Sequence, residues 1–283
     1  MRKLLSANVA RLVRSKTFWC CLLLCLVAGA WKAADFCREH SECNRYLYPG
    51  ADNVYQEFGF SLPFVIAVFI SIWLGSECST GVIRNKIIAG YTKGNVYLAN
   101  WLTCVIASVV LNLVQVITSA IPTSPWIIIF KEFEHYGKAF AYLMRYLGVS
   151  TLVVAALASV FVMIHMLLQK RTLGLVVSLA VLAVLMFTAA EMYGAINAQM
   201  YIYDTMDFVN GEFVPSLTKV YNPDYISGIK KDIYSLILDI QPIGQLFKFG
   251  RNTNIILYMC YSGIITVLTM GGGMLLFRKK NLQ

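Results

Sequence analysis

Residues 146–190 decide the fold: two long apolar runs, YLGVSTLVVAALASVFVMIHMLL (Tyr146–Leu168) and LGLVVSLAVLAVLMFTAA (Leu173–Ala190), are separated only by QKRT (169–172). About 20 helical residues, rising ~1.5 Å each, cross a hydrocarbon core of ~30 Å. A four-residue connection is typical of two antiparallel helices joined by a turn. The stretch therefore predicts a tight hairpin of membrane-spanning helices with two bases at its tip.

Four further apolar runs of similar length flank this hairpin, roughly at Thr17–Ala34, Phe58–Ser76, Val96–Ile121 and Ile255–Phe277. The whole chain of 283 residues is 58% hydrophobic and only 14% charged, with a mean hydropathy of +0.63. A soluble domain carries about 25% charged residues, so soluble, disordered and disulfide-framed secreted proteins are excluded. We expect an all-α polytopic membrane protein with six transmembrane helices in one domain, residues 1–283. The third helix should end at Pro122 and Pro125, which donate no backbone hydrogen bond.

The net charge of +9 is distributed unevenly along the chain. Six spans place both termini on one side, together with residues 77–95 and 168–172. With residues 1–16 and 278–283, these pieces hold 13 of the 24 Lys and Arg but one acid, Glu77. Short loops rich in Lys and Arg mark the cytosolic side. We therefore expect a multi-pass protein of the cell membrane with both termini in the cytosol, whose bases face anionic lipid headgroups and no nucleic acid.

Residues 1–16 predict an amphipathic helix at the membrane interface. If they are helical, one half of the circumference is apolar and the other carries bases; the two sets are Leu4, Leu5, Val9, Leu12 and Val13, and Lys3, Arg11 and Arg14. The alternative is a signal peptide with Phe18–Val27 as its apolar core and cleavage at residues 28–30. The long amphipathic start favours the interface helix.

Residues 192–254 form the longest stretch outside the predicted spans. The sequence around Tyr221–Tyr225 contains turn residues. Residues 232–249 are apolar yet too short to span, and Pro242 and Gly244 interrupt them. An apolar piece of this length is typical of interfacial or re-entrant segments, so we expect a pair of extracellular re-entrant helices here.

Two of the eight cysteines, Cys37 and Cys43, share the first outer loop with His40. They predict either a disulfide or two free thiols. A metal site is disfavoured because no fourth ligand lies at a suitable spacing.

Motifs of catalysis are absent from the sequence. There is no Gly-x-Ser-x-Gly elbow and no Gly-x4-Gly-Lys-Ser/Thr loop, so neither serine hydrolysis nor ATP hydrolysis by that loop is supported. We assign this chain no catalytic residue, metal or cofactor. Asn112, Gln115 and Glu191 are polar groups inside spans, which bond between helices or line a wet translocation path. His165 is interpreted as a polar core residue.

A short helix is expected between the second and third spans, within Glu77–Gly90. Ser76 or Ser79 would cap its start and Gly90 would end it. Its side chains mix apolar and basic types: Val82, Ile83, Ile87 and Ile88, with Arg84 and Lys86. Such a helix either rests on headgroups or docks on a protein.

An acid followed after three residues by Gly-Val-Ile-Arg, placed after the second span, resembles the coupling region of ABC-2 type permeases of ATP-binding-cassette transporters. The basic entry helix, six spans, long connection before the last span and basic ending agree with that family over the whole chain. The resemblance implies an ATPase-coupling site at these residues: Glu77, Gly81, Val82, Ile83, Arg84, Lys86 and Ile87. It also implies two permeases in a dimer, each on a separate ATPase subunit that binds the ATP and Mg²⁺.

The substrate expected from this resemblance is an amphipathic antimicrobial or toxin peptide, as for the phenol-soluble-modulin exporter and bacteriocin self-protection systems. The 16 Phe, 16 Tyr and 11 Met suit a path for such peptides because these side chains adapt to apolar partners. Export of lipids or hydrophobic drugs is the alternative. A channel or sensor subunit without an ATPase is an alternative of another class.

Overall fold

The computed structural model describes residues 1–42, 51–129, 136–203, 206–209, 212–215, 219–249 and 254–280. These residues form ten helices and four short strands. The helices are α1 (Arg2–Val13), α2 (Lys16–Glu42), α3 (Ala51–Ser79), α4 (Val82–Ile88), α5 (Lys93–Ile129), α6 (Tyr136–Leu168), α7 (Arg171–Asn197), α8 (Ile229–Ile240), α9 (Pro242–Lys248) and α10 (Ile255–Lys279). The strands are β1 (Tyr201–Tyr203), β2 (Met206–Val209), β3 (Glu212–Pro215) and β4 (Lys219–Tyr221).

Six of these helices are long and apolar enough to cross a membrane, as the sequence predicts. The candidate spans are Lys16–Asp35, Ser61–Ser79, Lys93–Ala120, Phe140–Leu168, Arg171–Asn197 and Ile255–Lys279. Each overlaps one predicted apolar run, and several extend a turn or more beyond it. The prediction of a helical, multi-pass membrane protein is confirmed.

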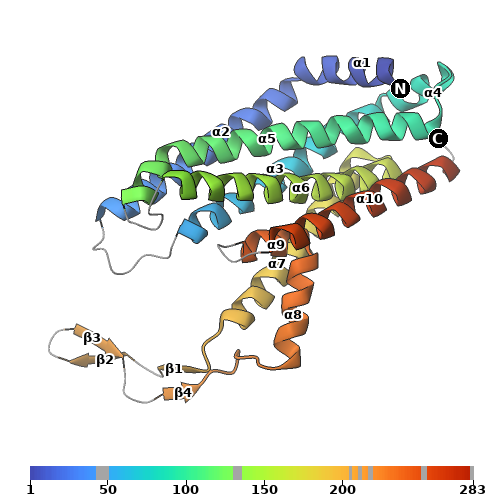
Figure 1. Cartoon of the computed structure of the whole chain (residues 1–283). Coiled ribbons are helices and arrows are strands. Elements are labelled where there is room, and N and C mark those ends of the chain that lie inside the picture. The colour runs from blue at the N-terminus through green and yellow to red at the C-terminus, as the bar shows by residue number, and fades with distance from the viewer. Residues whose placement is uncertain are drawn as a thin grey trace.

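The long helices run side by side, and both termini lie at one end of the bundle, together with α1 and α4 (Figure 1). We call this the basic end; it is made of α1, the last turn of α3, α4, the α6–α7 turn at Gln169 and Lys170, and the last turn of α10. The strands lie away from it, beyond α7 and α8 (Figure 1). We call that side the ribbon end.

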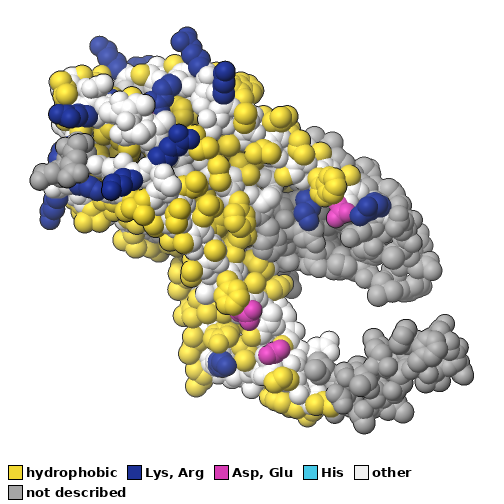
Figure 2. Space-filling model, turned by 180° about the vertical axis from the view of Figure 1, so that it is seen from behind, with side chains coloured by type: hydrophobic (Ala, Val, Ile, Leu, Met, Phe, Trp, Pro, Cys, Tyr) yellow, Lys and Arg dark blue, Asp and Glu magenta, His cyan; other side chains and the backbone are white. Residues whose placement is uncertain are grey.

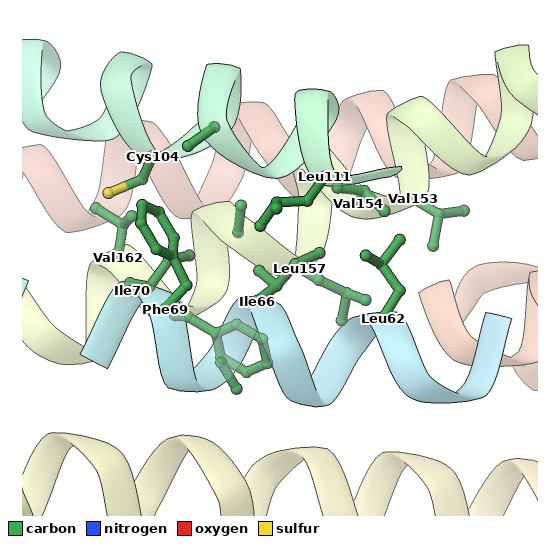
Figure 3. Close-up of a cluster of buried hydrophobic side chains, with 14 of the residues drawn as sticks. Leu62, Ile66, Phe69, Ile70, Cys104, Leu111, Val153, Val154, Leu157 and Val162 are labelled. Carbon is green, nitrogen blue, oxygen red and sulfur yellow. The ribbon is translucent and has the colours of Figure 1, made fainter. Parts of the chain in front are cut away.

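Helix α6 lies at the centre of the packing, against α3, α5 and α10. Figure 3 shows Ile66 and Ile70 of α3, Leu111 of α5 and Leu157 of α6 in one cluster. Each of these side chains is fully buried. Because lipid tails are as apolar as these residues, the cluster is held by close packing and not by escape from water.

Two lysines join helix ends at the basic end. Lys93 Nζ, at the start of α5, donates to the Lys280 carbonyl oxygen at 2.7 Å, just after α10. Lys280 Nζ in turn donates to the Leu167 carbonyl oxygen near the end of α6. Lysine side chains commonly satisfy such terminal carbonyls, and here they tie α5, α10 and α6 together.

Two predictions about local structure differ from the structure. Pro122 and Pro125 do not end the third long helix, because α5 continues to Ile129. Proline is tolerated in membrane helices when neighbouring groups satisfy the freed carbonyls. The strands were not predicted either: β1 pairs with β4 antiparallel, and β2 pairs with β3.

Glycine allows α2 and α5 to approach closely. A Cβ built on Gly29 would lie 2.8 Å from the Gln115 backbone oxygen. Small residues at such crossings are a common feature of membrane helix pairs.

We predict that Gly29→Ala destabilises the protein by about 1–3 kcal/mol, because the added methyl forces two backbones apart. Gly148→Ala is the matched control, since a Cβ there meets nothing within 4 Å. Unfolding of both variants in mild detergent, followed by circular dichroism, checks this. Equal unfolding midpoints for the two variants would contradict the close packing.

Candidate functional site

Lys and Arg side chains gather at the basic end, while hydrophobic side chains cover the flanks of the bundle (Figure 2). Within the described part of this end, the single acidic residue is Glu77. In this part of the chain it is therefore the one carboxylate that can balance the surrounding cations.

Glu77 lies in the last turn of α3, and its carboxylate has no exposed surface. Lys86 Nζ of α4 lies 2.9 Å from Glu77 Oε1. Arg11 Nη2 of α1 lies 2.7 Å from the same oxygen. One buried carboxylate thus holds a cation from each of the two short helices.

Two asparagines complete this arrangement. Asn100 Nδ2 of α5 donates to Glu77 Oε2 at 2.6 Å, and Asn8 Nδ2 of α1 donates to Asn100 Oδ1 at 2.8 Å. Lys86 Nζ also donates to Asn8 Oδ1 at 3.0 Å. We call Asn8, Arg11, Glu77, Lys86 and Asn100 the Glu77 cluster. It joins four helices, α1, α3, α4 and α5.

The buried charge of Glu77 is compensated by its neighbours. A buried charge costs several kcal/mol unless opposite charges and hydrogen bonds compensate it, and both carboxylate oxygens of Glu77 have partners. The Arg11 guanidinium also lies 4.0 Å from the ring centre of Trp73, a cation–π contact with another α3 residue. Removing one member of the Glu77 cluster should therefore destabilise the fold more than removing one member of an exposed ion pair.

Helix α4 is held between two glycines. Gly81 precedes it with φ +70°, and Gly90 follows it with φ +91°. Both values lie in the left-handed region, where a side chain costs about 1–2 kcal/mol. Gly90 thus ends α4 as the sequence predicts.

The start of α4 differs from the prediction. Glu77 belongs to α3, which continues to Ser79, and the short helix spans only Val82–Ile88. Neither serine caps it, because Ser76 Oγ donates to the Trp73 carbonyl and Ser79 Oγ donates to the Ser76 carbonyl. The acid is thus fixed in the bundle and receives Lys86 from the neighbouring helix.

The side chains of α4 divide into two faces. Ile83 is buried, and Ile87 and Lys86 are half-buried against the bundle. Val82 is also half-buried. Arg84 is exposed, and Ile88 is 74% exposed. The outer face of α4 thus presents a basic and an apolar side chain together.

The structure of α1 differs from the prediction at Arg11. Helical periodicity predicts Arg11 on the outer face with Lys3 and Arg14. In the structure Arg11 turns inward to Glu77, while Lys3 and Arg14 are exposed. Leu4, Asn8 and Leu12 are the buried residues of α1. A helix that packs on a bundle can direct a polar side chain inward when a buried opposite charge lies there. The amphipathic pattern of the helix alone does not predict such a contact.

The other polar groups predicted inside spans do not gather at one place. Asn112 Nδ2 donates to Ser150 Oγ of α6 at 3.1 Å, and Gln115 Nε2 donates to Ser61 Oγ of α3 at 2.8 Å. Both are interhelical bonds within the bundle. Glu191 is exposed on α7. His165 is buried, and its Nδ1 lies 2.9 Å from the Phe161 carbonyl oxygen, as expected for a polar core residue.

The predicted disulfide lies outside what the structure describes, since Cys43 and the Cys37 side chain are not among the described residues. Within the described residues, no group of three or more His, Cys, Asp or Glu is placed to hold a metal ion.

A second polar cluster lies towards the ribbon end and fastens α8 and α9 to the bundle. Lys248 Nζ of α9 lies 2.5 Å from Asp239 Oδ1 of α8, and Tyr258 Oη of α10 donates to the same oxygen at 3.0 Å. Ser262 Oγ of α10 donates to Gln245 Oε1 at 2.8 Å. The two predicted helices of residues 232–249 are thus present and tied to α10.

The architecture and site define a multi-pass helical membrane protein with a short helix clamped to its bundle by a buried carboxylate. The family model of the ABC-2 family transporter proteins matches residues 4–189, which include the whole Glu77 cluster and α4. The match covers more than half of the 283 residues, so the chain belongs to this family and is the membrane component of a transporter. No curated protein and no solved structure matches it.

We predict that Glu77→Gln lowers the free energy of unfolding by about 3 kcal/mol or more, because it removes the buried carboxylate that balances the half-buried cations Lys86 and Arg11. The double variant Glu77→Gln/Lys86→Met should recover part of this loss, since both charges are then removed. Glu191→Gln is the control, because Glu191 is exposed. Unfolding titrations of the native chain and these three variants check this prediction, and a Glu77→Gln variant as stable as the control would contradict it.

Proposed function

We propose that this chain is the permease subunit of an ATP-driven ABC exporter that moves amphipathic peptides out of the cell. The ATP and Mg²⁺ are bound by a separate ATPase subunit, as ABC-2 permeases work with one. The observation that carries the proposal is that α4 exposes Arg84 and Ile88 on its outer face while Lys86, on its inner face, is bound to Glu77. A partner that contacts Arg84 and Ile88 thereby acts on the bundle.

The Glu77 cluster gives a physical route for that coupling. A force on α4 would pass through Lys86 to the Glu77 carboxylate of α3. From there it would reach Asn100 of α5 and Arg11 of α1. Because a buried ion pair resists partial separation, the four helices would move as one body relative to the rest of the bundle. Closure of two ATPase subunits would then bias a bundle with two stable packings.

The charges support one orientation of the chain in the membrane. We place the basic end in the cytosol, since short loops rich in Lys and Arg are retained there, and α1 at the inner interface. The ribbon end is then extracellular. Two copies of the chain would form the working permease.

Helices α8 and α9 would be re-entrant in this placement. Gln241, at the start of α9, donates from Nε2 to the Leu185 carbonyl oxygen of α7. Leu185 lies 14 residues after Arg171, about 21 Å along the helix, inside a core of ~30 Å. This depth supports a plug at the outer mouth of the path, held by Asp239 and Lys248.

Amphipathic peptides are the favoured substrates because of the resemblance described above and the abundance of Phe, Tyr and Met. Lipids or hydrophobic drugs are the alternative cargo. ATP turnover of the complex with and without each class distinguishes them: stimulation by lipids or drugs but not by peptides would reverse the assignment. A channel or sensor subunit would retain its function without any ATPase.

We predict that Arg84→Glu weakens capture of the cognate ATPase by at least about tenfold, because it places a like or unpaired charge in the contact. The ATPase is found by co-expressing candidate ATPases with the tagged permease and testing which co-purifies. Lys279→Glu is the control, as an exposed cation at the same end outside α4. If the native permease captures an ATPase and Arg84→Glu captures it equally well, the assignment of α4 is wrong.

We predict that a membrane-impermeant maleimide labels Ile229→Cys on intact cells but labels Ile88→Cys only after lysis. Both residues are strongly exposed, at 78% and 74%, and they lie on α8 and α4, towards opposite ends. Cys37 and Cys43 are replaced by serine in both variants to remove outer thiols. Labelling of Ile88→Cys on intact cells would reverse the orientation.

A further inference from the structure

The junction of α1 and α2 exposes two cations without an acidic partner. Arg14 follows α1, Lys16 begins α2, and both side chains are exposed. The sequence contains no acid before Asp35, and Glu77 is fully buried and occupied by Arg11 and Lys86. Within the described residues, the structure gives neither Arg14 nor Lys16 an ion pair.

An aromatic side chain marks the same junction. The indole of Trp19 is 54% exposed, and its Nε1 donates to the Val13 carbonyl oxygen at 2.7 Å, which closes the end of α1. An exposed tryptophan whose polar atom is fixed is typical of the level where lipid headgroups meet hydrocarbon.

Below the cations, the exposed face of α2 is apolar. Leu23 is 60% and Val27 57% exposed, and their spacing from Lys16 and Trp19 places all four on neighbouring positions of one helix face. Val27 lies 11 residues after Lys16, about 16 Å along the helix, close to half of a ~30 Å core. The cations thus lie at one end of an apolar surface about one leaflet deep.

We propose that this junction binds an anionic phospholipid of the leaflet at the basic end. Arg14 and Lys16 hold its phosphate beside the Trp19 indole, and its acyl chain lies along Leu23 and Val27. An acidic protein surface would match the two cations but not the apolar face that continues from them, which is why a lipid is the occupant. This inference needs no ATPase and is independent of the proposed function.

The bound lipid would also affect α4. Arg14 lies one helical turn beyond Arg11, whose guanidinium contacts Glu77, and Glu77 holds Lys86 of α4. A headgroup that fixes the last turn of α1 therefore fixes the cluster on which α4 rests.

The test measures lipid binding to the purified chain alone. Bound phosphatidylglycerol and phosphatidylcholine are counted by native mass spectrometry, for the native chain and for Arg14→Gln/Lys16→Gln. We expect the native chain to prefer phosphatidylglycerol and the double variant to lose that preference by roughly tenfold or more. Lys230→Gln/Lys231→Gln, which removes two neighbouring cations from α8, should leave it unchanged.

Three results would overturn the proposal. The first is an unchanged preference in Arg14→Gln/Lys16→Gln, and the second is an equal loss in the α8 control. The third is displacement of the lipid by millimolar glycerol phosphate, which would mean that an anion site without an acyl-chain site is present. The variant's unfolding midpoint in neutral detergent should equal that of the native chain, because both side chains are exposed.

A protein occupant is distinguished by a capture experiment. If Arg14→Gln/Lys16→Gln binds phosphatidylglycerol normally but loses an ATPase in neutral nanodiscs, the cations belong to a protein contact and the lipid proposal is wrong.

The link to α4 is tested by hydrogen exchange in nanodiscs with and without phosphatidylglycerol. We expect the anionic lipid to slow exchange in both α1 and α4 of the native chain. In Asn8→Ala/Arg11→Gln, which removes both the Asn8–Lys86 hydrogen bond and the Arg11–Glu77 pair, the effect on α1 should remain while the effect on α4 disappears; an α4 effect that persists would overturn the link.

Discussion

The basic end depends on one carboxylate that lacks contact with water. Glu77 is ionically paired to Arg11 and Lys86 and hydrogen-bonded to Asn100, so α1, α4 and α5 are all attached to α3 at a single point. Burial of such a group is unfavourable on its own. It persists because every one of the attached helices contributes a compensating group, which makes the helices depend on one another for position.

A lysine–carboxylate pair lies towards each end of the bundle and holds helices that are outside the spans. At the basic end, Lys86 pairs with Glu77 and attaches α4 to the span helix α3. Towards the ribbon end, Lys248 pairs with Asp239 and joins α9 to α8, and Tyr258 of α10 bonds the same carboxylate and attaches both to the bundle. Between the two pairs lies an apolar core of α3, α5 and α6 (Figure 3). Polar chemistry is thus concentrated where helices must be held at defined positions, and the middle of the bundle is held by packing.

The six spans were predictable because length and apolar composition are a direct physical consequence of the bilayer. The Glu77 cluster was predictable only in part. Glu77 and Lys86 were found by motif, whereas Arg11 was assigned to the outer face because helical periodicity says which side chains are alike, not which meet a buried charge. Asn100 was overlooked among apolar neighbours, although a polar residue in a span is itself a signal. The strands were missed despite Asn210-Gly211 between alternating apolar residues, which favours a hairpin.

The two glycines that flank α4 let the backbone turn, so that α4 need not continue the direction of the neighbouring spans. At Gly81 and Gly90 a Cβ would meet nothing within 4 Å, so glycine serves there for its backbone freedom alone and not for space. The segment between them is consequently a separable unit of the fold: its outward residues can change without disturbing the bundle, provided that Lys86, which pairs with Glu77, is kept.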